Sequence, residues 1–500
     1  MRCATAVLTL VAGLCTAGSA TAESGADLAR FYGQQVDWHQ CADAGLVKEG
    51  AQCAEVTVPL DYGRLTGPTM KIAVSRIEAK DKDNRQGVLL SNPGGPASSG
   101  LDAFDLIGDV IEPEVLNRYD VIGFDPRGVA RSGAPKPCGW PVSNPIRSAG
   151  VDLAGFVAET LLQAQMAGSC LTWDATTPRY LTTRNTARDM DVIRGVLGAP
   201  RISYFGLSYG TYLGAVYTQM FPGRTDRMVY DSVVDPGRYW LGMQQDWGAA
   251  DEAGLDDWAA WTAEHDDTYH LGATAPEVRA GVEGLIQHAA RTPIPVAGFG
   301  VDEHLLPNIL WTMLRDARLN DTLARTIRTL VDLADGRSPE INKELLQQVD
   351  SARTDEYSVM AMIWCGDAPM PADPAWYWRA IEAARPTQPV FAALANNIQP
   401  CAFWPAPLEP PTVVDNAAPA LILQATGDNR TPYVEAVGLH QKLSASRLVT
   451  LQDVRIHMVL RPGLSSCVLD TANAYFRDGT LPEEDRTCYA NPTPAEPHPA

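Results

Sequence analysis

The sequence lacks several features, and each absence excludes a class of protein. No run of about 20 consecutive apolar residues occurs, so no segment is long enough to span a membrane. No basic patch is found and the formal net charge is −20, which argues against a nucleic acid as partner. No C-x-x-C spacing occurs, so we expect neither a zinc site nor a redox site, and no metal.

The composition is that of a globular protein. Apolar residues make up 45% and charged residues 20% of the 500 residues, which is not the balance of a disordered chain. Internal repeats are absent, and the tail 491–500 is the one stretch of low complexity. The length allows either one large core or two parts.

The first residues have the layout of a secretory signal peptide. One arginine and a short apolar stretch precede Ala20-Thr21-Ala22, which matches an A-x-A cleavage site. Leu14 stands before Cys15 where a lipobox has a small residue, so a lipoprotein is disfavoured. We predict a signal peptide over 1–22, a mature chain from Glu23, and a secreted protein that is extracellular or associated with the cell surface.

Cysteine usage agrees with export. Eight cysteines remain after the signal peptide, and an even number in an exported chain predicts disulfides rather than reactive thiols. Eight cysteines allow 105 pairings. We predict successive pairing because each bond then closes a short loop: Cys41–Cys53, Cys138–Cys170, Cys365–Cys401 and Cys467–Cys488.

Apolar runs and helical stretches alternate in the first half of the chain. Strands are predicted over 55–62, 71–79, 87–95, 119–128, 202–208 and 228–236, with a helix over 185–198. Short buried strands separated by helices predict an α/β fold, with a mostly parallel sheet covered by helices on both faces. The alternation returns after residue 418.

Between these halves the sequence reads as helices. Nine of the twelve tryptophans fall between residues 236 and 405, where they either pack a helical subdomain or line a substrate pocket. We therefore divide the chain into a signal peptide (1–22), a first half of the core (23–235), a helical cap (236–405) and a second half of the core (406–500). The cap is predicted to cover a site carried by the sheet.

The segment "ISYFGLSYGTYLG" contains a G-x-S-x-G motif at Gly206–Gly210. Serine is a poor nucleophile unless a base removes its proton and donors stabilise the oxyanion. The motif lies between a predicted strand and a predicted helix, which is the context of a nucleophile elbow. We predict that Ser208 is a nucleophile; the alternative is a serine in a glycine-rich turn.

The partners of such a serine follow in the order acid, then histidine. Asp428 ends the predicted strand over 418–428, although an aspartate there also suits a turn or a helix cap. Of the later histidines, His440 falls within a predicted helix and His498 in the tail. His457 follows a predicted strand by a short loop, so we predict that it is the general base.

The oxyanion needs backbone donors. Gly94 and Gly95 follow the predicted strand over 87–95, and their N–H groups, together with that of Tyr209, are candidates for this role. A plain turn is the alternative reading of the two glycines.

With these motifs the chain resembles the secreted actinobacterial tripeptidyl aminopeptidases, relatives of the proline iminopeptidases in the α/β-hydrolase superfamily. The resemblance covers most of the mature chain and rests on "VPLDY", "NPGGPASSG", "YDVIGFDPRGVARS", "YFGLSYGTYLGAVYTQMFP", "DSVVDP" and "ATGDNRTP". It implies a core with a helical cap, and cleavage of short peptides from a free N-terminus. It also implies Ser208, Asp428 and His457 as triad, with the N–H groups of Gly95 and Tyr209 as oxyanion donors.

The chain departs from this family at two places. Ile456 and Met458 flank His457 where the family commonly has glycines, and Ala97 replaces the last glycine of a Gly-Gly-Pro-Gly segment. Bulk beside His457 would narrow the leaving-group side or alter loop mobility. We expect these differences to affect the substrate range.

Two further residues have a predicted role. An exopeptidase needs a carboxylate for the substrate's ammonium group, and Asp367 is the candidate because Cys365 would fix its position. Arg127, in "FDPRGVARS", is predicted to pair internally and hold loops below the site.

We therefore expect a secreted serine exopeptidase that works through an acyl-enzyme and needs no cofactor. An esterase or amidase acting on a small secreted metabolite, such as a peptide-like antibiotic, is the alternative, since the same core hosts both chemistries. A binding protein with a vestigial site is a more distant alternative. The substrate is predicted to be a peptide or another small molecule, and the oligomeric state is not indicated.

Overall fold

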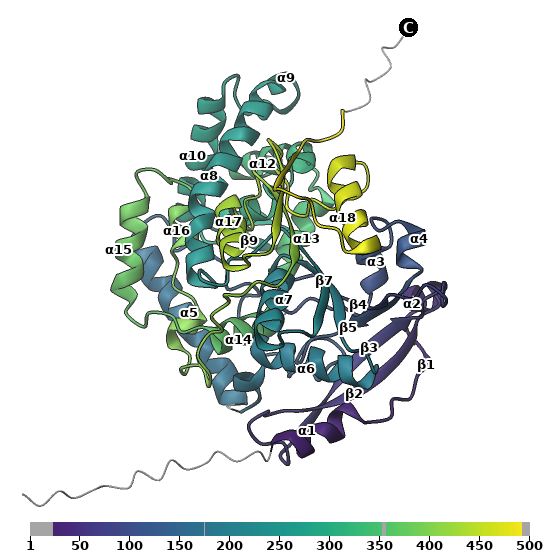
Figure 1. Ribbon diagram of the computed structural model, residues 1–500. Helices are drawn as coiled ribbons and strands as arrows, with labels where there is room; N and C mark the ends of the chain where they lie inside the picture. Colours follow the sequence, from purple (N-terminus) through teal and green to yellow (C-terminus); the bar gives the residue numbers. More distant parts are fainter. Residues whose placement is uncertain (1–23, 175, 353–356, 493–500) are drawn as a thin grey trace, which may run out of the picture.

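The computed structural model describes residues 24–174, 176–352 and 357–492 (Figure 1). The predicted signal peptide lies outside these residues. No helix in the described part is long and apolar enough to cross a membrane.

In the described residues, ten strands form one sheet in the order β1-β2-β3-β5-β4-β6-β7-β10-β11-β12. The bounds are β1 His39–Gln40, β2 Gln52–Pro59, β3 Thr69–Ile77, β4 Gly87–Asn92, β5 Tyr119–Phe124, β6 Ile202–Leu207, β7 Thr225–Asp231, β10 Ala420–Ala425, β11 Arg447–Leu451 and β12 Arg486–Cys488. Pairing is antiparallel from β1 to β5 and parallel from there to β12. The predicted α/β fold with a mostly parallel sheet is confirmed.

Both faces of the sheet are buried because successive side chains of a strand point to opposite faces. In β4, Val88 and Leu90 pack into one core and Leu89 into the other. The first core lies under α1 Ser24–Tyr32, α6 Thr183–Val196, α7 Tyr209–Met220 and α17 Tyr433–Lys442. The second lies under α3 Ala103–Ile107, α4 Pro113–Leu116 and α18 Ser466–Asp478, which Figure 1 shows grouped beside the sheet. The short α2 Ala44–Lys48 follows β1.

The segment between β7 and β10 is mainly helical and has a core of its own. Its helices are α8 Leu241–Ala263, α9 Asp266–Tyr269, α10 Ala275–Arg291, α11 Leu306–Met313, α12 Asn320–Ala334, α13 Lys343–Ser351, α14 Ser358–Asp367, α15 Pro374–Ala384 and α16 Ala392–Ala395, with short 3₁₀ turns η2 Ala317–Leu319 and η3 Pro400–Phe403. Figure 1 shows α8, α10, α15 and α16 on the side of the molecule away from β1, β2 and β3.

The structure differs from the sequence-based expectation at two places. A hairpin, β8 Ile294–Val296 and β9 Phe299–Val301, interrupts the predicted helical segment, because Ala297 and Gly298 make a turn with positive φ. In addition, α5 Leu153–Trp173, which precedes the predicted cap, packs against η3 and α15. The helical part therefore draws on two segments of the chain. The short η1 Thr177–Tyr180 follows α5.

Four disulfides connect the described residues: Cys41–Cys53, Cys138–Cys170, Cys365–Cys401 and Cys467–Cys488. These are the bonds that successive pairing predicts. Cys138–Cys170 attaches α5 to the loop after β5, and Cys365–Cys401 joins α14 to η3. Cys41–Cys53 joins the segment after β1 to β2, and Cys467–Cys488 joins α18 to β12.

Candidate active site

Ser208 lies at the tight turn between β6 and α7, with φ 56° and ψ −125°. A positive φ is costly for a serine, and such backbone strain is often found at functional positions. The neighbouring glycines are needed for close packing, since a Cβ at Gly206 would lie 2.5 Å from the Gly210 carbonyl oxygen. A Cβ at Gly210 would lie 2.4 Å from the Asn92 carbonyl oxygen. The motif thus forms the strand–turn–helix geometry of a nucleophile elbow.

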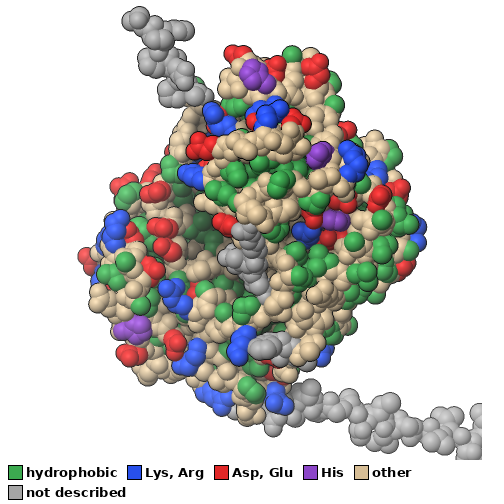
Figure 2. All heavy atoms as spheres, turned by 180° about the vertical axis from the view of Figure 1, so that it is seen from behind, with side chains coloured by type: hydrophobic (Ala, Val, Ile, Leu, Met, Phe, Trp, Pro, Cys, Tyr) green, Lys and Arg blue, Asp and Glu red, His purple; other side chains and the backbone are tan. Residues whose placement is uncertain are grey.

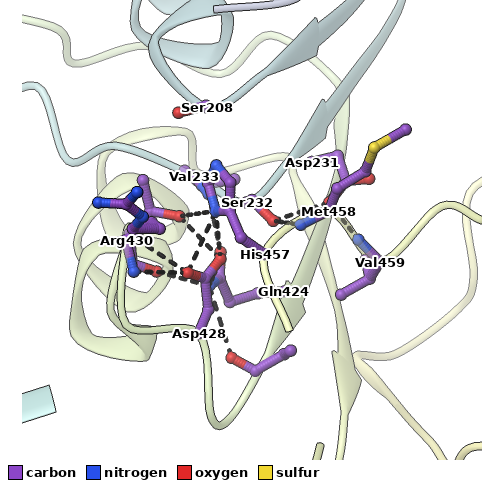
Figure 3. Close-up of polar contacts among 12 residues, drawn as sticks. Ser208, Asp231, Ser232, Val233, Gln424, Asp428, Arg430, His457, Met458 and Val459 are labelled. Atoms are coloured by element: carbon purple, nitrogen blue, oxygen red, sulfur yellow. Dashed lines mark hydrogen bonds and ion pairs between the residues drawn. The ribbon is translucent and has the colours of Figure 1, made fainter. Parts of the chain in front are cut away.

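His457 and Asp428 meet at the carboxyl end of the sheet. Asp428 follows β10, and His457 lies in the loop after β11. The His457 Nδ1 atom is 2.9 Å from one Asp428 oxygen and 3.1 Å from the other. Figure 3 shows the imidazole between Ser208 and Asp428. Figure 3 draws no hydrogen bond between the Ser208 hydroxyl and His457; such contacts often tighten only when a substrate is bound.

The Asp428 carboxylate is 2% exposed and surrounded by donors. The N–H groups of Arg430 and Thr431 donate to one of its oxygens at 2.8 and 3.1 Å, and the Thr431 hydroxyl donates to the other at 2.9 Å. Burial alone would raise the pKa of Asp428, but His457 and these backbone N–H groups hold it below its ordinary value. Asp428 is therefore ionised at neutral pH and suited to orient an imidazolium.

The loop that carries His457 is fixed to the end of β7. The buried Asp231 carboxylate accepts hydrogen bonds from the N–H groups of Val459 at 2.9 Å and Leu460 at 2.8 Å. The Ser232 hydroxyl accepts another from the Met458 N–H at 2.7 Å (Figure 3). Met458 has a φ of 77°, a conformation that glycine adopts at low cost. These contacts hold a non-glycine residue beside the histidine.

The glycine-rich segment after β4 lies against the serine turn. Gly94 has a φ of 96°, and a Cβ there would lie 2.6 Å from the Leu207 carbonyl oxygen. Gly95 and Tyr209 line the same cavity as Ser208, and among the described residues neither backbone N–H has a hydrogen-bond acceptor. Ala97, with φ 76°, stands in a conformation that favours glycine. Two free N–H groups are thus available next to Ser208.

One cavity of about 600 Å³ contains Ser208 and His457 in its lining. Four tryptophans of the helical segment also line it: Trp240, Trp247, Trp311 and Trp364. Trp258, in contrast, is buried in the core of the helical segment. Some tryptophans therefore line the pocket, and others pack the helical segment. Figure 2 shows a hollow with hydrophobic side chains on the face opposite to that of Figure 1.

The charged residues that line the described part of the cavity are basic. Arg315 and Arg430 line it, whereas none of its lining residues that the structure describes is an aspartate or a glutamate. The Asp367 side chain is 3% exposed and lies outside the lining. Its oxygens accept hydrogen bonds from the Thr183 N–H at 2.7 Å, the Thr183 hydroxyl at 2.6 Å and the Tyr239 hydroxyl at 3.3 Å. Direct contact with a ligand would require these bonds to rearrange, so its binding role stays a prediction.

Asp367 nevertheless borders the cavity indirectly. Tyr239 lines the cavity and donates to Asp367, while the Tyr209 hydroxyl is 2.6 Å from that of Thr183. Burial raises the pKa of Asp367 to about 7. The carboxyl group is therefore near its titration point at neutral pH.

Arg127 is fully buried and pairs with Asp189, with Nη2 and Oδ1 at 2.6 Å. The same guanidinium donates to the carbonyl oxygens of Pro59, Leu60 and Tyr180. The predicted internal pairing is confirmed: Arg127 joins the loops after β2, β5 and η1.

Sequence reasoning missed Thr431, Asp231, Arg315 and Arg430. Arg430 and Thr431 stand two and three residues after Asp428 in the "DNRTP" segment, so the sequence already placed them near this carboxylate. Asp231 lies inside the strand predicted over 228–236, so the sequence did not place it at the sheet edge; in the structure β7 ends at Asp231. Arg315 had no such signal, because only the folding of α11 over the sheet brings it to the cavity.

The fold and the site define an α/β hydrolase. The family model described as "alpha/beta hydrolase fold" matches residues 87–283, and the one described as "TAP-like protein" matches residues 388–488. The tripeptidyl aminopeptidase of Streptomyces lividans is 34% identical over 486 residues, which cover 92% of this chain and 87% of that protein. The chain belongs to the tripeptidyl aminopeptidase family of α/β hydrolases, and it is an enzyme of the serine hydrolase class.

Other relatives carry different names. The serine protease Hip1 of Mycobacterium tuberculosis is 29% identical over 497 residues, covering 91% of both chains. Carboxylesterase B of the same organism is 30% identical over 488 residues, covering 91% of this chain and 90% of that protein. Similarity to both kinds of enzyme leaves the choice of substrate to be decided by the site itself.

Proposed function

We propose that this protein is a serine exopeptidase that releases short peptides, tripeptides in particular, from free N-termini. The observation that carries the proposal is the His457–Asp428 contact at 2.9 Å, at the edge of a cavity that Ser208 shares with two free backbone N–H groups. A nucleophile, a base with its orienting carboxylate and oxyanion donors are the components of acyl transfer.

The reaction follows from this arrangement. The Ser208 hydroxyl attacks the scissile carbonyl carbon while His457 takes its proton. The Gly95 and Tyr209 N–H groups stabilise the oxyanion, and Asp428 stabilises the imidazolium. His457 then gives the proton to the leaving amine, and the C–N bond breaks. Water, activated by the same histidine, releases the acyl group from Ser208. These steps need no metal and no organic cofactor.

The cavity supports a short substrate. Its volume of about 600 Å³ lies within the range of roughly 300–1,000 Å³ that is usual for small-ligand pockets. Aromatic side chains, four of them tryptophans, form part of its walls, and a peptide of a few residues would lose water where it packs against them. A folded protein would not fit into such a space.

The decisive experiment compares matched substrates with the wild type and Ser208→Ala. A tripeptide anilide with a free amine, its acetylated form and a short-chain ester are hydrolysed in parallel. We expect activity on the free amine alone, lost in Ser208→Ala. Serine-dependent activity that ignores acetylation would contradict the N-terminal specificity, and activity that survives in Ser208→Ala would contradict the nucleophile.

For the ammonium group we propose Asp367, acting at the cavity wall beside Tyr239. Asp367→Asn keeps the size of the side chain and removes its charge. The Michaelis constant is expected to rise for free-amine peptides and to stay the same for acetylated ones. If the constant for free-amine peptides does not change, this assignment is wrong.

An esterase is the second candidate, because carboxylesterase B is 30% identical over most of the chain. The same triad and oxyanion donors would cleave an ester. Activity confined to the short-chain ester in the experiment above would favour this function.

We also propose that the protein is secreted after cleavage before Glu23. The four disulfides support export, because such bonds persist in oxidising compartments. The N-terminal sequence of protein recovered from the culture medium tests this proposal. A retained segment 1–22 would contradict it.

A further inference from the structure

Two guanidinium groups line the cavity, and the described residues of its walls supply no counter-charge. Arg315 follows α11 and Arg430 follows Asp428, and both side chains line the cavity that contains Ser208. Of the described lining residues, none carries a carboxylate. A positive cavity of this kind suits an anionic group of the substrate, and it is unexpected for an enzyme that must also accept an ammonium group.

One nitrogen of the Arg430 guanidinium lacks a hydrogen-bond partner among the described residues. Its Nη1 atom is buried and makes no hydrogen bond to any residue that the structure describes. The carbon between its nitrogens lies 3.0 Å from the centroid of the Trp311 ring, so the group stacks on a cavity wall. Buried polar atoms without a partner are rare, and one in a cavity indicates a ligand that supplies the missing acceptor.

Two acids that the structure describes interact with this guanidinium electrostatically, and neither makes a hydrogen bond with it. The Asp428 carboxylate is engaged by His457 and Thr431, and it meets Arg430 through the backbone N–H. Figure 3 shows the guanidinium turned away from that carboxylate. Asp251 is buried and accepts a hydrogen bond from Asn429, and burial raises the pKa of Asp251 well above its ordinary value.

Both arginines border the histidine side of the site. The Arg315 carbonyl oxygen accepts a hydrogen bond from the His457 N–H at 2.8 Å. Arg430 is two residues from Asp428, the partner of His457. In acyl transfer the histidine gives its proton to the leaving amine, so the groups around it face the leaving part of the substrate.

We propose that Arg315 and Arg430 form a carboxylate subsite that binds the free α-carboxylate of the leaving residue. This deepens the proposed exopeptidase function and rests on it. Guanidinium groups bind a carboxylate through paired N–H donors, which gives both affinity and orientation. The enzyme would then favour short peptides whose C-terminus lies directly after the scissile bond, such as a tetrapeptide that loses its first three residues.

The test compares tetra-alanine, its C-terminal amide, and the amide of Ala-Ala-Ala-Asp. We expect the wild type to cleave the free acid with a kcat/KM at least about tenfold above that of the amide. Arg315→Gln and Arg430→Gln are each expected to bring this ratio close to one, and Arg315→Lys to restore part of it. Arg325→Gln removes an exposed arginine of α12 outside the cavity lining and should keep the wild-type ratio.

Each outcome has a defined meaning. A ratio near one in the wild type, or a ratio unchanged in both arginine variants, would overturn the subsite. If the amide of Ala-Ala-Ala-Asp is cleaved with the same kcat/KM as the free acid of tetra-alanine, the result supports the subsite. The carboxylate that it binds is then the side-chain carboxylate of the leaving residue. Because Arg315 is exposed, its variant remains informative even if Arg430→Gln does not fold.

A neutral substrate separates this proposal from the proposed function. Ala-Ala-Ala p-nitroanilide has no carboxylate on its leaving group. One outcome is that the wild type cleaves this anilide, Ser208→Ala does not, and the wild type cleaves tetra-alanine and its amide with equal kcat/KM. In that case the carboxylate subsite is wrong and the proposed exopeptidase function stands. If the anilide and the peptides are not cleaved in a Ser208-dependent way, the proposed function itself is wrong.

Discussion

Gly94 offers a direct test of how the serine turn is held. Its φ is 96°, and a Cβ would lie 2.6 Å from the Leu207 carbonyl oxygen and 3.0 Å from the Ser208 Cβ. Comfortable contacts need about 3.5 Å, so in Gly94→Ala the two segments must separate by about 0.5–1 Å. A displacement of about 1 Å at a reacting group costs about 100-fold in rate. We therefore expect kcat/KM on a tripeptide anilide to fall about 100-fold.

Gly87→Ala is the matched control. Gly87 also has a positive φ, 123°, but a Cβ there would meet nothing within 4 Å. It begins β4, at the opposite end of the strand from the serine turn. Both variants should lose about 1–2 kcal/mol of stability from the backbone conformation, measured by urea unfolding. Activity should fall only in Gly94→Ala; equal kcat/KM values for the two folded variants would refute the steric reasoning.

Two further variants test the support of the histidine loop and a buried carboxyl. Asp231→Asn loses one of the charge-assisted bonds to the Val459 and Leu460 N–H groups. We expect the free energy of unfolding to fall by about 1.5–3 kcal/mol and kcat to fall at least about tenfold. An unchanged kcat would count against the positioning role of Asp231. Burial raises the pKa of Glu435 to about 9, so the folded protein keeps a proton that the unfolded chain has lost, and stability falls as the pH rises towards 9. Glu435→Gln keeps the acceptor for the Asp235 N–H. This variant should therefore be more stable than the wild type at pH 8.5 but not at pH 4. Equal differences in urea midpoint between the two proteins at pH 8.5 and at pH 4 would contradict this reasoning.

The core of the fold was predictable because its signals are local. The buried runs of β4, β6 and β10 are short and apolar, and each ends in residues that form a turn. The Gly206–Gly210 motif identifies its own strand–turn–helix context, and Asp428 follows β10 at the same sheet edge. Because the carboxyl ends of parallel strands lie at the same edge of a sheet, these turns come together there.

The composition of the cavity could not be predicted in this way. Arg315 and the tryptophans reach it only through the packing of the helical segment over the sheet, and no local pattern describes that packing. The surroundings of Asp367 could not be predicted for the same reason. Its neighbour Cys365 does form a disulfide, but Thr183 and Tyr239 come from other parts of the chain and occupy its oxygens.

The central claim is that Ser208 is the nucleophile activated by His457. It is tested most directly by intact-mass analysis after treatment with a fluorophosphonate, using the wild type, Ser208→Ala and His457→Ala. The account predicts one adduct on the wild type, located at Ser208, no adduct on Ser208→Ala, and much slower labelling of His457→Ala. Labelling of Ser208→Ala, or a wild type that hydrolyses peptides without being labelled, would contradict it.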